Sequence, residues 1–198
     1  MPNMAIDPLV AMSHIHLGIH EINSREITPG KFLVATIGKM NGGTTFNIIP
    51  DTASMSGTIR TFDKDVRTLA RTRIREIAEG IGAAYRCGVE VNYSIECPSL
   101  INNDFLLEKT FQYTKEILGE DQVLEGKTIE LGTLSGSEDF AFISERVPSV
   151  VIGIGGSVQI DGVIYNQHHP KVVFDESVLV NGTAIYVNCA LKWLQDNQ

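Results

Sequence analysis

The chain has 198 residues, a formal net charge of −8, an apolar fraction of 43% and seven prolines. This length is enough for one large or two small domains with a real core, and the composition excludes a disordered chain. An acidic balance without a basic stripe argues against nucleic acid and anionic membrane surfaces as partners. Three scattered cysteines indicate buried thiols, and no basic-then-apolar leader or membrane-length apolar run is visible, so the expected location is the cytoplasm.

The first half of the sequence predicts two helices and three strands. Asp7-Pro8 is a helix-start signal, and an apolar stripe follows it through Arg25. Alternating runs predict strands over residues 32–40 and 52–62. Residues 65–84 have apolar side chains near a 3.6-residue period, which predicts a second helix. An alternating run over 88–95, ended by Cys97-Pro98, predicts a third strand.

The second half has the pattern of an α/β domain. Residues 104–119 predict a helix that Gly119 ends. A short apolar run occupies 128–131, and residues 147–154 form an apolar, β-branched run typical of a strand buried on both faces of a sheet. Asp175-Glu176 leads into a long predicted helix that reaches Trp193.

Asn47 and Arg60 stand out because each is a lone polar or charged side chain in an otherwise apolar neighbourhood. The small, alternating residues between them predict a strand with Asn47 near one end and Arg60 near the other. A guanidinium and a carboxamide together suit a carboxylate ligand. The alternative also stays open that Asn47 shapes a turn before Pro50 and that Arg60 ends a strand in solvent.

Several strings along the chain share a resemblance to one family. They include Met1–Ala11, Ser24–Glu26, Gly42–Asp63, Ser135–Phe140, Val147-Pro148 and His168–Lys171. With these motifs the chain resembles the metal-dependent amidohydrolases that include aminoacylase, carboxypeptidase G, hippurate hydrolase and the indole-acetyl-amino-acid hydrolases. The resemblance covers nearly the whole chain, but it involves only the second half of the family's usual pattern.

The resemblance implies an α/β fold in two parts. Residues 1–98 would form an incomplete lid, or dimerisation, domain of the α/β-sandwich type that lacks one edge strand. Residues 99–198 would form the C-terminal part of an α/β catalytic domain. A strand beside the missing one would expose unpaired N–H and C=O groups, so a homo-oligomer is expected.

The sequence lacks the family's Cys-x-His-Asp motif and its Glu-Glu pair. The first carboxylate of that Glu-Glu pair would be the general base. The chain is therefore expected to be a fragment whose Met1 is not a natural beginning, and to be inactive by itself. The parent protein would cleave N-acyl amino acids or related amides with two divalent metals, Zn, Mn, Co or Ni, none of them held tightly here. The alternative is a non-enzymatic dimerisation or regulatory module.

The resemblance also assigns roles to individual residues. Asn47 and Arg60 would hold the substrate carboxylate, Gly155 would belong to a loop whose backbone contacts substrate, and His168 would bind metal. His169 would be a neighbour of the metal site or a solvent residue.

Glu138 has two interpretations that stay open together. In the resembled family it lies at the rim of the metal site, where it would orient a metal-bound histidine. The other interpretation is a helix start, in which Ser135 or Ser137 accepts the free amides and the acidic residues favour the helix dipole.

His16 and His20 are four residues apart on the first predicted helix, a spacing that zinc-binding pairs use. No glutamate adjoins the first histidine, and the resembled family holds no metal there. Together with His14, they are interpreted as polar residues of a solvent or dimer face.

Overall fold

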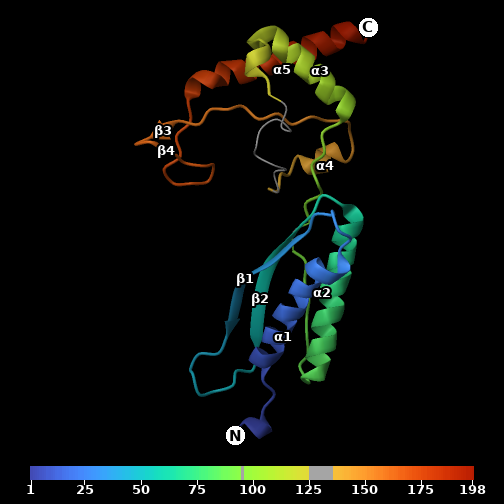
Figure 1. Cartoon of the computed structure of the whole chain (residues 1–198), viewed down its shortest axis with the longest axis vertical. Coiled ribbons are helices and arrows are strands. Elements are labelled where there is room, and N and C mark those ends of the chain that lie inside the picture. Colours follow the sequence, from blue (N-terminus) through green and yellow to red (C-terminus); the bar gives the residue numbers. More distant parts are fainter. Residues whose placement is uncertain (95, 125–135) are drawn as a thin grey trace. The chain divides into compact units, whose positions relative to one another are not determined.

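The computed structural model describes residues 1–94, 96–124 and 136–198 (Figure 1). The fold is mixed α/β with small sheets, and the chain divides into two compact units, chiefly Met1–Ser99 and Leu100–Gln198. None of the helices in the described residues is both long enough and apolar enough to cross a membrane.

In the part of unit 1 that the structure describes, there are two long helices and one β-hairpin. Its elements are η1 (Pro2–Met4), α1 (Pro8–Glu21), η2 (Ile22–Glu26), β1 (Val34–Gly42), β2 (Ala53–Arg60) and α2 (Lys64–Ala84). Asp7 begins α1 as the sequence predicts, because its carboxylate accepts the amides of Leu9 at 2.9 Å and Val10 at 3.4 Å. Asp63 caps α2 in the same way, through the amides of Asp65 and Val66.

The hairpin is antiparallel, with Val34 opposite Arg60 at one end and Gly42 opposite Ala53 at the other. A bulge interrupts the register between Ile37 and Lys39. Gly57 has no room for a side chain against the facing strand, since a Cβ built on it would be 2.1 Å from the carbonyl oxygen of Thr36. This position therefore requires glycine.

Helices α1 and α2 cover one face of the hairpin (Figure 1). The core between them has two clusters of buried residues, Ile22 with Leu33, Val66 and Ala70, and Ile15 with Ile19 and Ala78. Ile22 is fully buried. This packing gives unit 1 a core of its own.

Residues 88–94 form no β-ladder, so the third strand predicted from the sequence is wrong as a hydrogen-bonded element. The segment nevertheless has the alternation of a strand, because Val89, Val91 and Tyr93 are partly buried while the residues between them are exposed. The side chains anchor it on α2, but no described backbone lies beside it to make a ladder. Alternation reports burial, whereas a ladder needs a neighbouring strand.

The described residues of unit 2 form two long helices, short helical turns and one small hairpin. Its elements are α3 (Asp104–Leu118), η3 (Glu120–Gln122), α4 (Ala141–Ser144), β3 (Gln159–Ile160), β4 (Val163–Ile164), η4 (Glu176–Val178) and α5 (Leu179–Asp196). Asn103 caps α3 through the amide of Leu106, and Gly119 ends it with a positive φ of 84°. Both ends of α3 agree with the sequence prediction.

Polar contacts join α3 to α5. The Tyr113 hydroxyl donates to Asp196 at 2.6 Å, Lys109 pairs with the same carboxylate at 3.0 Å, and the Asn188 amide donates to the Tyr113 carbonyl at 2.8 Å. The hydrogen bond from Tyr113 lowers the pKa of Asp196 and raises that of Tyr113 to about 12. The hydrophobic residues of unit 2 that are buried, among those described, are Tyr113, Ala141 and Ile185.

The strand predicted over residues 147–154 also forms no ladder. Instead Asn102 grips this run, accepting the Val151 amide at 2.8 Å and donating to the Val151 carbonyl at 3.0 Å, while the Asn103 amide donates to Ser149. A buried strand of this composition needs strands on both sides, which the described residues do not provide. The run predicted at 128–131 lies outside the described residues.

Candidate functional site

Arg60 is the last residue of β2, where it pairs with Val34 in the hairpin ladder. The side chain is half-buried. The next residue, Thr61, accepts a hydrogen bond from the Ser99 hydroxyl and donates one to the Phe32 carbonyl. The backbone that carries the guanidinium is thus fixed on both sides, which suits a residue that must present a charge in one direction.

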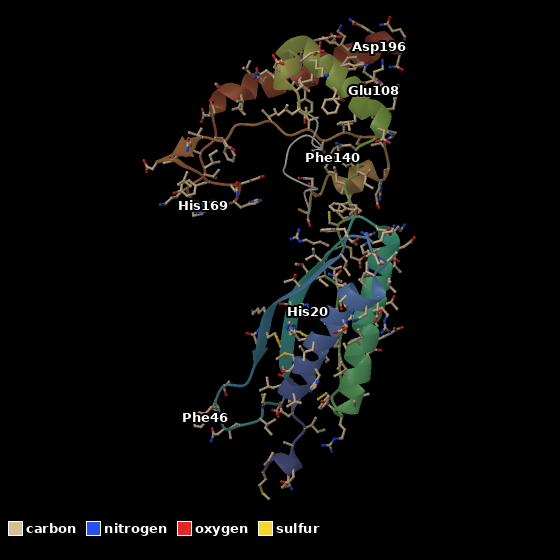
Figure 2. The ribbon with its side chains drawn as sticks, in the orientation of Figure 1. His20, Phe46, Glu108, Phe140, His169 and Asp196 are labelled. Atoms are coloured by element: carbon tan, nitrogen blue, oxygen red, sulfur yellow. The ribbon has the colours of Figure 1, made fainter. Side chains whose placement is uncertain are left out.

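Asn47 lies in the loop between β1 and β2, beside the fully exposed Phe46 (Figure 2). The Thr45 hydroxyl donates to its side-chain oxygen at 3.2 Å. This loop follows Gly42, so it lies at the opposite end of the hairpin from Arg60. The seven steps from Ala53 to Arg60 span about 23 Å at the usual strand rise. The structure therefore does not bring Asn47 and Arg60 of one chain together.

His168 follows the β3–β4 hairpin and is exposed, with a φ of 72° that places it in the left-handed region. Non-glycine residues adopt this conformation rarely, and it turns the chain sharply at the histidine. The imidazole is presented by a tight turn and not by a helix or strand.

The neighbouring His169 anchors this turn (Figure 2). Its ring stacks on Tyr165 with 4.4 Å between ring centroids, and its Nδ1 accepts the Lys171 amide at 3.1 Å. Because Nδ1 is an acceptor, the proton of the neutral ring is on Nε2. Sequence reasoning did not find this anchoring role. The available signal was the aromatic Tyr165 four residues before His169.

Glu138 lies just before α4 and accepts the amide of Phe140 at 3.2 Å. Its carbonyl oxygen also accepts the amide of Ala141. The helix-start interpretation therefore holds in part, but with Glu138 in place of the serine, since α4 has no side-chain cap at its N-cap residue. Ser135 lies outside the described residues.

Gly155 is exposed, and a Cβ built on it would have open space around it. The adjacent Gly156 accepts the Asp175 amide at 2.8 Å, and Ser157 forms a bridge with Phe174. The glycine loop is therefore fixed at its far end and open at Gly155, which leaves the Gly155 backbone accessible to a ligand.

The described residues contain no group of three or more His, Cys, Asp or Glu side chains that could hold a metal ion. His168 by itself does not make a metal centre, which needs several ligands. The His16 and His20 rings contact each other edge to face at 4.7 Å, and His14 stacks on Tyr85. These contacts show no third ligand for the His16–His20 pair among the described residues.

The chain is similar to a protein family and to several characterised proteins. The family described as Peptidase family M20/M25/M40 matches residues 6–192. The chain is 31% identical to IAA-amino acid hydrolase ILR1-like 2 of Arabidopsis thaliana, over 99% of this chain and 44% of that protein. It is 28% identical to N-acetyl-L-cysteine deacetylase of Bacillus subtilis, over 100% of this chain and 45% of that protein.

A crystal structure from Bacillus subtilis, described as a dinuclear metal-binding peptidase of the M20 family, superposes with a TM-score of 0.74 at 27% identity. The match covers 96% of this chain and 46% of that one. The chain thus spans less than half the length of the relatives that it matches.

Proposed function

The chain belongs to Peptidase family M20/M25/M40, and from this premise we propose that it supplies the substrate-positioning part of a metal-dependent amidohydrolase acting on N-acyl amino acids. The substrate class is supported by the names of two relatives, an IAA-amino acid hydrolase and an N-acetyl-L-cysteine deacetylase. Both names describe an acyl group joined to an amino acid, which keeps its free carboxylate in such a compound.

Arg60 is the residue proposed to bind that carboxylate. Its backbone is held in a ladder and by the hydrogen bonds of Thr61, so the guanidinium is presented from a rigid strand end. A guanidinium binds a carboxylate through two parallel hydrogen bonds, which fix the orientation of the substrate as well as its position. This anchored placement of Arg60 is the observation that carries the proposal.

Asn47 can bind the same substrate carboxylate as Arg60 only if the two residues come from different copies of the chain. Because Asn47 lies in the loop before Ala53, and about 23 Å of strand separates Ala53 from Arg60, the two side chains of one copy do not reach the same carboxylate. The proposed carboxylate site therefore takes Arg60 from one copy and Asn47 from its partner. This extends the expectation of a homo-oligomer by giving the second copy a role in substrate binding.

His168 is proposed as one metal ligand. The remaining ligands would come from the region of the full-length family members that this chain does not match. A divalent metal of this kind activates a water molecule and polarises the substrate carbonyl. Glu138 and the Gly155 backbone keep the proposed roles of a supporting carboxylate and a substrate contact. His169 holds the turn that carries His168.

The competing proposal is a dimerisation or regulatory module without catalysis. The absence of the family's Glu-Glu pair, which would contain the general base, favours it for the chain by itself. Both proposals expect the isolated 198-residue chain to show no turnover with Zn, Mn, Co or Ni, because the general base and most ligands are missing. Turnover comparable to that of a full-length relative would contradict both.

A chimera distinguishes them. Residues 1–198 replace the matched region of the Bacillus subtilis N-acetyl-L-cysteine deacetylase, and hydrolysis of N-acetyl-L-cysteine is measured with added metal. The enzymatic proposal expects turnover that His168→Ala abolishes, with a loss of bound metal, and that Arg60→Ala weakens while metal stays bound. A folded chimera that binds metal without turnover, or whose two variants match the parent chimera, would support the non-catalytic module.

A further inference from the structure

The hairpin of unit 1 has an apolar end on the face that is turned away from the helices. Helices α1 and α2 cover the other face (Figure 1), and Leu33 and Ile59 pack in the core on that side. Because side chains alternate along an extended chain, the neighbours of these two residues belong to the outer face. At this end of the hairpin the outer residues are Phe32, Val34 and Arg60.

Phe32 and Phe62 form an aromatic pair across the two chain segments. In the β1–β2 register Val34 lies opposite Arg60, so Phe32 and Phe62 follow as the next pair on the same face. Their ring centroids are 5.1 Å apart. The Thr61 hydroxyl donates to the Phe32 carbonyl at 2.6 Å, which joins the segments beyond the last ladder pair. The aromatic pair is therefore a fixed part of the strand end that carries Arg60.

The rest of the outer face of the ladder is polar and exposed. Its residues are Thr36, Lys39, Asn41, Ser54, Ser56 and Thr58. Against this polar face, Phe32 keeps 40% of its surface exposed, and Phe62 and Val34 are partly buried. An apolar surface next to a guanidinium suits a ligand that has an apolar group and an anion side by side.

A second cation, Lys31, adjoins the aromatic pair on the side away from Arg60. The Lys31 ammonium forms an ion pair with Asp63. The same Asp63 carboxylate accepts the amides that begin α2, so its position is fixed by the helix. Because Asp63 compensates its charge, Lys31 does not compete with Arg60 for the carboxylate of a ligand. The anion of such a ligand is directed to the Arg60 side of the pair.

We propose that Phe32, Val34 and Phe62 form an apolar seat for the side chain of the amino-acid part of the substrate, beside the carboxylate that Arg60 binds. The inference rests on the proposed function, which places the substrate carboxylate on Arg60. It adds a specificity: the seat selects N-acyl amino acids whose own side chain is apolar, such as leucine, over N-acylglycines.

The chemistry of the substrate decides which of its groups meets the apolar seat. In an N-acyl amino acid the side chain and the carboxylate are bonded to the same carbon, whereas the acyl group lies beyond the amide nitrogen. Two residue steps from Arg60 to Phe62 span at most about 7 Å. The substrate side chain is therefore the group that reaches the seat once the carboxylate is on Arg60, while the acyl carbonyl faces the proposed metal.

The test measures binding to the full 198-residue chain by NMR titration, so it does not depend on turnover. Two isomeric ligands are compared, N-acetyl-L-leucine and N-hexanoylglycine, with N-acetylglycine as the reference. The isomers have the same charge and composition, but the first has its apolar group on the amino-acid side and the second on the acyl side. N-acetyl-L-leucine should bind about tenfold or more tightly than N-acetylglycine, because its isobutyl group is buried on the seat. N-hexanoylglycine should resemble the reference.

Variants separate a role in binding from the stabilisation that a cross-strand aromatic pair gives to any hairpin. Phe32→Ala and Phe62→Ala should each remove the preference for N-acetyl-L-leucine and leave the affinity for N-acetylglycine unchanged. Phe62→Leu keeps an apolar side chain and should keep most of the preference. Phe105→Ala is the matched control, because Phe105 is 58% exposed and belongs to another aromatic pair, with Trp193 at 6.1 Å between ring centroids. It should leave the preference intact.

The possible failures are distinguishable. Equal affinity for N-acetyl-L-leucine and N-acetylglycine, with both weakened by Arg60→Ala, would overturn the apolar seat and leave the proposed carboxylate site standing. A preference for N-hexanoylglycine that Phe62→Ala removes would assign the seat to the acyl group and overturn the proposal too. Binding of none of the three ligands would count against the Arg60 site itself and overturn both.

Discussion

Ile22→Ala tests whether unit 1 has a packed core of its own. Ile22 is fully buried and packs with Leu33, Val66 and Ala70. The change removes three carbons, which at about 0.8 kcal/mol each lowers the free energy of unfolding by about 2.4 kcal/mol through lost transfer energy. The cavity left behind adds to this loss, so the expected total is about 3–4 kcal/mol, within the range for such truncations.

The assay is urea unfolding followed by far-UV circular dichroism, with Ile48→Ala as the control. Ile48 is the same residue type in the β1–β2 loop with 63% of its surface exposed, so its truncation should change the free energy of unfolding by less than about 0.5 kcal/mol. A loss below about 1 kcal/mol for Ile22→Ala, or equal losses for both variants, would refute the described core.

Three further predictions concern other parts of the chain. The lowered pKa of Asp196 stabilises unit 2 above about pH 4 and is lost as the pH falls, while the raised pKa of Tyr113 stabilises it below about pH 10 and is lost toward pH 12. Tyr113→Phe should therefore flatten the alkaline loss of stability, measured through the single tryptophan; an unchanged alkaline profile would contradict the hydrogen bond. Gly57→Ala should disrupt the hairpin and lower the melting temperature, because the added carbon would lie 2.1 Å from a strand carbonyl oxygen. An unchanged melting temperature would show that the two strands move apart easily enough to accommodate the methyl group. In the chimera, a mixture of Asn47→Ala and Arg60→Ala subunits should be more active than either variant alone, and a mixture no more active than the variants would place both residues outside a shared site.

The helix ends were predictable because their signals are local. Asp7 and Asn103 cap the helices that follow them, and Gly119 ends α3 with the positive φ that glycine accommodates. Each signal acts within a few residues of the helix end. Tertiary context was not needed to read them.

Two predicted strands failed for a shared reason. Residues 88–94 have the alternation of a strand and residues 147–154 have the apolar, β-branched composition of one, but a ladder depends on a neighbouring backbone that the described residues do not provide. In residues 88–94 the alternation indicated which side chains are partly buried, whereas in residues 147–154 Val147, Val151 and Ile154 are exposed despite the prediction of a buried strand.

The candidate site was predictable only residue by residue. The sequence placed Asn47 and Arg60 at opposite ends of a strand, yet their joint grip on one carboxylate within a single chain conflicts with the length of that strand. The left-handed turn at His168 lies beside the Tyr165–His169 stack, a contact between side chains that no local pattern specifies.

The central claim, that Arg60 binds the substrate carboxylate, is tested most directly by comparing N-acetyl-L-cysteine with its carboxamide in the chimera. Arg60→Ala should lower kcat/KM for the acid, and this decrease should correspond to a loss of about 2–4 kcal/mol of transition-state stabilisation. The loss for the carboxamide should be much smaller, because the carboxamide lacks the negative charge. Arg60→Lys should restore only part of the loss, since a point charge does not reproduce the two parallel hydrogen bonds. Equal losses for acid and carboxamide, or unchanged kinetics with both, would show that Arg60 is a strand-end residue without a role in substrate binding.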